Sequence, residues 1–207
     1  MMLWSAFNDI VLAELPQAPS PLVVQYARRV AIDFCETTQL YVVDLTAIDV
    51  VATTATYSLT APSSETTPSE VVSAYLSGAP LKMIPVTQLR RTGTRWAADT
   101  AVAPTGFTQL DSATVTLYPK PTANATGALS LTATLKPSLT STGLVAWMAN
   151  KYYYDLANGI KALLMSMPGK SWSNPEGAKV YAGMYGGAVT AAAQAAGRNV
   201  QRARLTD

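Results

Sequence analysis

Two pairs of carboxylates come nearest to an acid/base site in this sequence of 207 residues. Asp44 lies five residues before Asp49, and Asp33 lies three residues before Glu36, and paired carboxylates are what glycoside hydrolysis requires. The second pair shares one face of a predicted helix, and that face is predicted to be solvated. We therefore interpret all four side chains as surface charges and assign no catalytic residue.

The absence of histidine removes several other chemistries. Within this chain it excludes a Ser-His-Asp triad, a Cys-His pair and any zinc site that uses histidine. The single cysteine, Cys35, cannot form an intrachain disulfide, and its place beside Phe34 on the apolar side of a predicted helix favours a packed thiol. A metal site would have to be built from the 13 carboxylates alone.

The segment Gly169-Lys170-Ser171 matches the end of a phosphate-binding loop. That motif needs a further glycine five residues before Gly169, where this chain has Leu164 inside a predicted helix. It also needs a strand that leads into the loop, and the sequence pattern shows none there. We interpret the segment as a turn between two helices.

Three consecutive tyrosines, Tyr152, Tyr153 and Tyr154, could form a stacking platform for bases or sugars. On a helix, however, three consecutive positions point in different directions. We therefore expect one ring to lie in the core and the other two at a rim or an interface.

Arg90, Arg91 and Arg95 form the densest basic cluster, in a predicted strand and turn that Trp96 follows. The cluster could contact the phosphate backbone of DNA, or it could pair with acidic residues of a neighbouring subunit. The sequence leaves both readings open.

A second basic region follows Gly197, where the last predicted helix ends. Residues 198–207 include Arg198, Arg202 and Arg204 in a short polar stretch. Such a stretch can become ordered when it docks on an acidic groove or on the edge of a partner's sheet. We expect a flexible docking tail here.

Helices and strands must position these residues, and three long helices are predicted. Ser20 and Pro21 predict the start of an amphipathic helix over residues 20–38, with Ser20 as its cap. Residues 7–15, which precede it, form either a short helix or an extended arm.

Two more helices are predicted in the last third of the chain. An apolar residue at every fourth position over residues 144–164 predicts a long helix, which Pro168 ends. The stretch Asn174-Pro175-Glu176 begins the next one, because it supplies a cap, a first-turn proline and a carboxylate at the positive end of the helix dipole. This helix is expected to extend to about Gly197.

The middle of the chain is rich in β-branched residues and tyrosine, which is typical of strands. Residues 61–68 are predicted to form an exposed loop, residues 69–76 a helix or a strand, and residues 124–127 a hairpin loop. The predicted strands are residues 39–45, 47–59, 80–90, 113–118 and 128–135.

These elements predict an α+β fold. A helical bundle is built from the N- and C-terminal segments, and a mainly antiparallel β region is inserted between them. The expected divisions are residues 1–38 and 138–197 for the bundle, 39–137 for the β-rich inserted domain, and 198–207 for the basic docking tail.

Charge is sparse along the chain, at 14% of the residues and a net value of +2. A weakly hydrated surface fits a protein that hides much of its exterior against copies of itself or against partners. Residues 180–197 carry no charge and place Gly183 and Gly187 at GxxxG spacing. Because Ala and Gly dominate this stretch, we interpret it as a helix packed tightly against other helices and not as a membrane span.

Several stretches together resemble one protein family. They are residues 19–38, the strand ending Leu117-Tyr-Pro-Lys-Pro121, and residues 157–168 followed by Trp172-Ser-Asn-Pro175 and Ala178-Lys-Val-Tyr181. In this order they are similar to bacteriophage head-to-tail adaptor proteins of the tail-tubular-protein-A type, found in short-tailed phages. The likeness covers both helical ends and the late strands.

The resemblance implies a structural virion protein that is not an enzyme and needs no cofactor. It implies a ring of twelve copies beneath the portal and above the tail nozzle, with genomic DNA passing through the lumen, and assembly in the host cytoplasm without a membrane. On this basis we expect Arg198, Arg202, Arg204 and Leu205 to dock on the portal. The β region would face outward or toward the nozzle and the tail fibres.

Three other functions stay open from the sequence. A siphophage-type head-completion or neck protein lies within the same structural class. A virion-associated glycan-degrading enzyme would need a carboxylate pair whose conversion to amides abolishes an activity. A membrane-active protein would use residues 180–197, and leakage from liposomes would reveal it.

Overall fold

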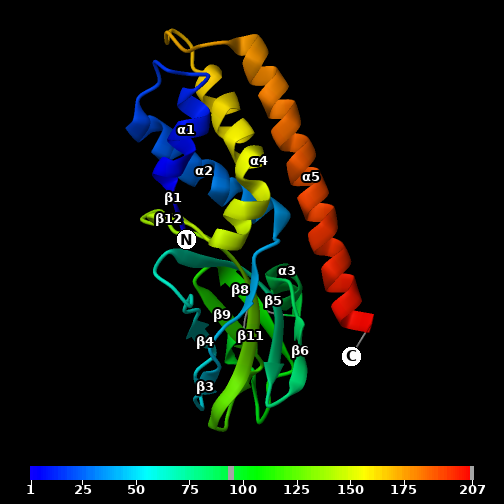
Figure 1. Cartoon of the computed structure of the whole chain (residues 1–207). Helices are drawn as coiled ribbons and strands as arrows, with labels where there is room; N and C mark the ends of the chain where they lie inside the picture. The colour runs from blue at the N-terminus through cyan, green and yellow to red at the C-terminus, as the bar shows by residue number, and fades with distance from the viewer. Residues whose placement is uncertain (93–95, 206–207) are drawn as a thin grey trace. The chain divides into compact units, whose positions relative to one another are not determined.

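The computed structural model describes residues 1–92 and 96–205, with the backbone alone for residue 92 and residues 198–205. The chain divides into two compact units (Figure 1). Met1–Leu40 and Lys136–Asp207 form one, and Tyr41–Leu135 forms the other. The fold is mixed α+β, since helices dominate the first unit and a mainly antiparallel sheet dominates the second.

Three long helices form most of the first unit, which we call the helical unit. They are α2 (Ser20–Thr38), α4 (Ala146–Met165) and α5 (Pro175–Leu205), and each contacts the other two. The short helix α1 (Phe7–Leu12) follows the 3-10 turn η1 (Trp4–Ala6) and packs on α2 and α4. The segment 7–15, left open between helix and extended arm, is therefore helical over residues 7–12.

Aromatic rings join these elements in one core. Trp4 and Phe7 are fully buried with ring centroids 6.5 Å apart, and Phe7 stacks on Tyr153 of α4 at 5.0 Å. Phe34 of α2 lies 4.9 Å from the ring of Tyr152. The N-terminal segment, α2 and α4 are thus held together by residues that are more than 100 positions apart in the sequence.

The helix α2 has the predicted bounds, but the residue at its cap position is not the predicted one. Ser20 is the first helical residue and not the cap, and Pro19 occupies the cap position without a side-chain hydrogen bond. The Pro19 carbonyl accepts the N–H groups of Leu22 and Val23. The ring of Pro19 already favours the φ of −66° found there, so restricted backbone geometry replaces the expected hydroxyl cap.

The apolar row predicted for residues 144–164 is not helical over its whole length. Leu144 belongs to β12 (Gly143–Leu144), which pairs antiparallel with β1 (Met2–Leu3). The helix α4 starts two residues later, and Tyr152 within it has non-helical angles, φ −119° and ψ 15°, which mark a kink. Pairing with the N-terminal strand therefore takes precedence over helical periodicity at this end.

The helix α5 begins as predicted and ends later than predicted. Asn174 Oδ1 accepts a hydrogen bond from the Gly177 N–H at 3.0 Å, which confirms Asn174 as the cap. The helix continues through Gly197 to Leu205, so the predicted helix end near Gly197 is wrong, and residues 206–207 lie outside the described part. A glycine inside a helix costs only about 1 kcal/mol, and the Ala, Gln and Arg residues around it are good helix formers.

The second unit, the β unit, is built on an eight-stranded sheet in the order β2-β11-β5-β6-β8-β9-β4, with β3 also paired to β11. β6 and β8 run parallel, whereas β2–β11, β3–β11, β5–β6, β8–β9 and β4–β9 are antiparallel. β7 and β10 form a separate parallel pair. The bounds are β2 Val42–Asp44, β3 Ile48–Val50, β4 Thr56–Ser58, β5 Thr66–Leu76, β6 Ala79–Met83, β7 Thr100–Ala101, β8 Gly106–Asp111, β9 Thr114–Tyr118, β10 Lys120–Pro121 and β11 Ala125–Pro137, with α3 Val86–Thr92 and the 3-10 turn η2 Trp96–Ala98 between β6 and β7.

Alternate residues of β11 supply one side of the sheet's core. Leu129, Leu131, Ala133 and Leu135 are all buried, which is the period-two pattern of a strand with one face inward. They belong to one apolar cluster with residues from β5, β8 and β9, namely Val71, Ala74, Phe107, Val115 and Leu117.

Two predicted strands have different structures. Residues 47–59 contain two short strands, β3 and β4, separated by a turn in which Thr53 has a φ of +66°. Residues 80–90 leave the sheet after Met83 and continue as α3, whose first turn uses the carbonyl of Pro85 as acceptor for Gln88. The open segment 69–76 lies within strand β5.

The hairpin predicted at residues 124–127 is wrong. β9 pairs with β8 and β4, whereas β11 pairs with β2, β3 and β5. The hairpin is instead β8–β9, where the Asp111 carboxylate accepts the Ala113 N–H at 2.8 Å and the Thr114 hydroxyl at 3.0 Å. β8 escaped prediction because its sequence, GFTQLD, contains only two large apolar residues.

Candidate interaction surfaces

The two aspartates paired by sequence in the β unit are each bonded elsewhere. Asp44 accepts a hydrogen bond from the Thr132 hydroxyl at 2.7 Å, and Asp49 accepts one from the Gly127 N–H at 2.5 Å. Both bonds tie a short strand or its flank to β11. Each carboxylate therefore has a structural partner of its own.

The second predicted pair, on α2, is also divided between two partners. Asp33 Oδ2 accepts a hydrogen bond from the Tyr185 hydroxyl at 3.0 Å, and Glu36 forms an ion pair with Lys136. Both carboxylates are exposed, as the solvated face predicts. Among the described residues, no group of three or more His, Cys, Asp or Glu residues could hold a metal ion.

Cys35 is a packed thiol, as expected. It is buried, and its Sγ donates to Met148 Sδ at 3.7 Å. Burial, with a smaller effect of the Glu36 carboxylate, raises the pKa of the Cys35 thiol to about 12. A thiol that stays protonated at neutral pH is a poor nucleophile.

The three tyrosines point in three directions, which confirms the interpretation made from the sequence. Tyr152 is buried, Tyr153 is half-buried with its hydroxyl donating to the Ala6 carbonyl at 2.9 Å, and Tyr154 is 71% exposed. The Gly169-Lys170-Ser171 segment lies in the turn between α4 and α5, also as predicted.

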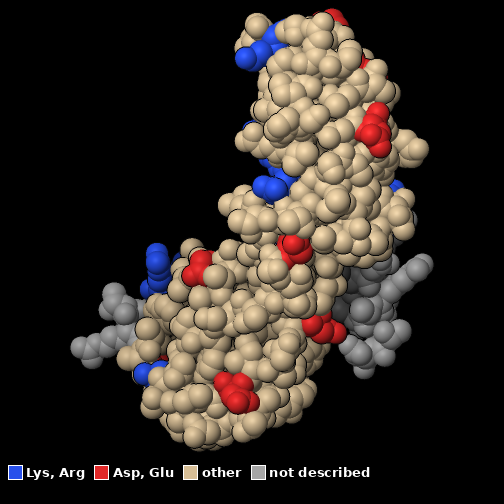
Figure 2. Space-filling view, turned by 60° about the vertical axis from the view of Figure 1, so that its left-hand side comes forward, with Lys and Arg blue, Asp and Glu red and all other residues tan. Residues whose placement is uncertain are grey.

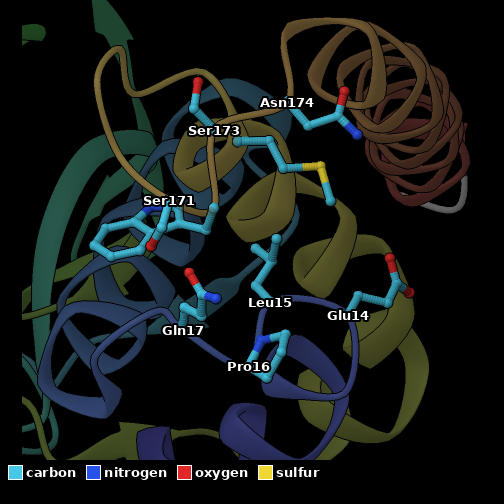
Figure 3. A pocket seen from close by; sticks show the side chains of 9 residues that line it. Glu14, Leu15, Pro16, Gln17, Ser171, Ser173 and Asn174 are labelled. Carbon is cyan, nitrogen blue, oxygen red and sulfur yellow. The ribbon is translucent and has the colours of Figure 1, made fainter.

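A pocket of about 260 Å³ lies between the loop after α1 and the loop after α4 (Figure 3). Glu14, two residues after the end of α1, stands at its edge and binds two helices. Its Oε1 accepts Lys161 Nζ of α4 at 2.5 Å, and its Oε2 accepts the hydroxyl of Tyr181 of α5. These two hydrogen bonds lower the pKa of Glu14, and the bond from Lys161 has the larger effect on it. The carboxylate is therefore ionised and bound to α4 and α5, and the arrangement stabilises the fold.

The sequence pattern does not reveal this cluster. Glu14 and Lys161 are separated by 147 positions, and Lys161 directly follows Ile160 of the apolar row. The signal available in the sequence is the charge of Lys161, because a lysine among the buried apolar residues of a helix needs a partner.

A second cavity, of about 230 Å³, lies between the three long helices, and we call it the α2–α4–α5 groove. Gly159 forms part of its floor. A Cβ at that position would lie 2.8 Å from Val30 Cγ1 and 2.9 Å from Tyr185 Cδ2, so only glycine permits this approach of α4 to its neighbours. The groove is lined by Arg29, Val30, Asp33, Gly159, Ala162, Leu163, Ala182 and Tyr185.

The glycines predicted to pack, Gly183 and Gly187, lie on the opposite side of α5. Both are exposed, and a Cβ on either would meet nothing within 4 Å. Within this chain they do not pack against another helix, and their packing against a helix of another copy stays a prediction. The same side of α5 exposes two larger apolar residues, Val180 at 57% and Met184 at 54%.

The basic residues chosen from the sequence are only partly described. Arg90 and Arg91 are exposed on α3 and not on a strand, and Arg95 lies outside the described residues. The backbones of Arg198, Arg202, Arg204 and Leu205 belong to α5, and their side chains lie outside the description.

One family of proteins matches almost the whole chain. A family model described as SU10 adaptor protein matches residues 4–206. The chain belongs to the SU10 adaptor family. None of the curated proteins gives a significant match.

The family match includes both the helical unit and the β unit of this adaptor, and it indicates a phage protein with a structural role in the virion. The resemblance to phage adaptors is thereby confirmed at this level, whereas the tail-tubular-protein-A type stays a prediction. Adaptors act between other virion proteins. The face of this protein in Figure 2 carries few charged side chains, in line with a charged fraction of 14%. Among its described residues, no helix has both the length and the apolar character needed to cross a bilayer.

Proposed function

We propose that this adaptor is a head-to-tail connector of a phage virion. Identical copies form a ring that joins the portal to the tail nozzle and surrounds the channel through which DNA passes. The observation that carries the proposal is the family match over residues 4–206. The resemblance to the tail-tubular-protein-A type supports a ring of twelve copies.

Exposed apolar surface on α5 supports self-association. Residues 180–197 carry no charge, and Val180 and Met184 are more than half exposed. Uncharged helical surface of this kind favours contact with protein over contact with water.

We propose that the end of α5 docks on the portal through Arg198, Arg202, Arg204 and Leu205. Three arginines in this stretch suit an acidic surface. Because residues 198–205 are already helical, docking loses less conformational entropy than the ordering of a flexible tail would. The helical end is therefore a better docking element than the tail expected from sequence.

The β unit is proposed to face outward or toward the nozzle and the tail fibres. Its exposed Arg90 and Arg91 on α3 suit either DNA in the channel or an acidic residue of a neighbouring copy. Cross-links from residues 113–135 in the assembled complex should reach nozzle or fibre proteins. Cross-links from this segment to the portal alone would contradict the orientation.

The decisive experiment mixes the purified chain with the purified portal ring of the same phage. Negative-stain imaging and native mass measurement should show a ring of adaptor on one face of the portal. Deletion of residues 198–207 should abolish binding, whereas deletion of residues 206–207 alone should not. Binding that survives the longer deletion would remove the docking proposal, and a full chain that fails to bind would remove the proposed function.

A further inference from the structure

The helical unit carries an exposed ridge and a groove that match each other in charge and in apolar character. We infer that the ridge of α5, formed by Glu176, Lys179, Val180 and Met184, docks in the α2–α4–α5 groove of a second copy of this chain. The inference rests on the proposed function, because it names the surfaces by which neighbouring copies of the ring would meet.

The ridge combines two apolar side chains with two charges. Val180 and Met184 are exposed by 57% and 54%, and their spacing of four positions makes them neighbours on the helix surface. Lys179 directly precedes Val180, its Nζ lies 2.9 Å from Oε1 of Glu176 one turn earlier, and these two side chains are 74% and 83% exposed. The ridge is therefore an apolar pair with a cation and an anion at one end.

The groove presents the complementary arrangement. Its floor consists of small and apolar residues of α4 and α5, namely Gly159, Ala162, Leu163 and Ala182. At its rim stand two exposed charges of α2, Arg29 and Asp33. Among the residues that the structure describes, neither of these two charges takes part in an ion pair.

Docking would join apolar surface to apolar surface and each charge to its opposite. Met184 and Val180 would cover the floor, Lys179 would face Asp33, and Glu176 would face Arg29. Opposite charges at the rim fix the register of such a contact and exclude wrong partners, while the apolar centre supplies most of the affinity.

The positions of ridge and groove on α5 decide the kind of assembly. At about 100° per residue, Ala182 and Tyr185 of the groove lie within about 40° of the buried Ala178 around the helix axis. Val180 and Met184 lie about 200° and 240° from it. Each copy thus offers its ridge and its groove on different sides, so the contact is head-to-tail, and repeated head-to-tail contacts close into a ring or continue as a filament.

Disulfide trapping tests this contact directly. The double variant Ala182→Cys with Met184→Cys puts one thiol in the groove and one on the ridge, and the native Cys35 is buried. Because a disulfide needs Cα atoms within about 7 Å, only docked copies cross-link efficiently. We expect a ladder of dimers, trimers and larger products on mild oxidation, from the chain alone at high concentration or bound to the portal ring. The matched control, Ala182→Cys with Tyr154→Cys, uses a 71% exposed position away from the ridge and should give no such ladder.

Each result of this experiment has one meaning. If the chain forms rings on the portal and the double variant cross-links no better than the control, the inference falls and the proposed function stands. If the chain neither associates with itself nor binds the portal, both fall. Products that stop at dimers would indicate a two-fold contact and would overturn the head-to-tail arrangement.

Charge reversal tests the register. Asp33→Lys or Lys179→Asp alone should weaken self-association about fivefold, and both changes in one chain should restore it to within about twofold. Lys170→Asp, a reversal on the exposed turn after α4, serves as the control and should change little. Met184→Asp should weaken association about tenfold or more, because it places an unpaired carboxylate in the apolar centre. A double reversal as weak as the single ones would overturn the pairing of Lys179 with Asp33.

Discussion

The two sides of α5 differ in what they contact within the chain. The inner side meets the rest of the helical unit through two tyrosines four positions apart: Tyr181 donates to Glu14, and Tyr185 donates to Asp33. The outer side presents Val180 and Met184 with glycines between and after them, and it touches nothing in the chain at those glycines. One helix thus carries an intrachain side marked by hydroxyls and an open side marked by small residues.

This difference shows why the GxxxG spacing was misleading within a single chain. The spacing of Gly183 and Gly187 records that a close approach is sterically possible, but it does not say which partner makes it. The glycine that is required for packing inside this chain is Gly159, which stands in no motif and faces Tyr185. Packing against a large ring, and not glycine spacing, identifies the inner side.

The largest expected effect comes from adding a methyl group at Gly159, where α4 packs against the inner side of α5. Gly159→Ala should lower the free energy of unfolding by about 2–3 kcal/mol, because the added Cβ would lie within 3.0 Å of both Val30 and Tyr185. Urea unfolding followed by circular dichroism measures the change. A variant as stable as the parent would show that α4 and α5 separate easily, and the contrast between the two sides would fail.

Removing the Glu14 carboxylate, which ties the loop after α1 to α4 and α5, should have the next largest effect. Glu14→Gln leaves the buried Lys161 without its anion, and we expect a loss of about 1–2 kcal/mol. The loss stays below that of a fully buried pair because the Glu14 side chain is 41% exposed. Glu176→Gln, which affects the exposed pair with Lys179, is the matched control and should change stability by less than about 0.5 kcal/mol.

The same variant makes a prediction about pH. Lys161, and then Tyr181, lower the pKa of Glu14 in the folded protein, so this group stabilises the fold above its unfolded pKa. That contribution should disappear as the pH falls below about 4 toward the folded pKa. The stability difference between parent and Glu14→Gln should therefore shrink on acidification, and a difference that stays constant from pH 6 to pH 3 would contradict the assignment.

The start of α5 belongs to neither side and should show a smaller effect. Asn174→Ala removes the side-chain acceptor for the Gly177 N–H and should cost about 1 kcal/mol, measured as a shift in the urea midpoint. Asn174→Asp keeps an acceptor oxygen at the cap and should retain most of the stability. Equal losses in both variants would mean that the acceptor oxygen at position 174 does not account for the contribution of the cap.

Local signals in the sequence were sufficient for some elements. The range of α2 and the cap at Asn174 were predictable because each depends on residues within one helical turn. The three directions of Tyr152, Tyr153 and Tyr154 followed from helix geometry alone. In each case the information lies within a few neighbouring positions.

Other features depend on partners far away in the sequence and could not be predicted. The pairing of β11 with β2, β3 and β5 joins distant segments, and local sequence pattern fits a hairpin at residues 124–127 equally well. The ion pair of Glu14 with Lys161 spans 147 positions. The predicted end of α5 at Gly197 is wrong for a different reason. A glycine ends a helix only when its backbone leaves the helical region.

The smallest predicted effect has the opposite sign and belongs to the outer side. Gly183→Ala should raise the free energy of unfolding of the single chain by about 0.5–1 kcal/mol, because alanine is the better helix former and its Cβ meets nothing within 4 Å. Measured beside Gly159→Ala, the same substitution would stabilise on one side of the helical unit and destabilise on the other. Gly187→Ala, one turn further along α5, provides a second measurement on the open side and should agree in sign. Destabilisation by both outer substitutions at concentrations where the chain is monomeric would mean that these glycines already pack within one copy, and the two sides of α5 would no longer differ.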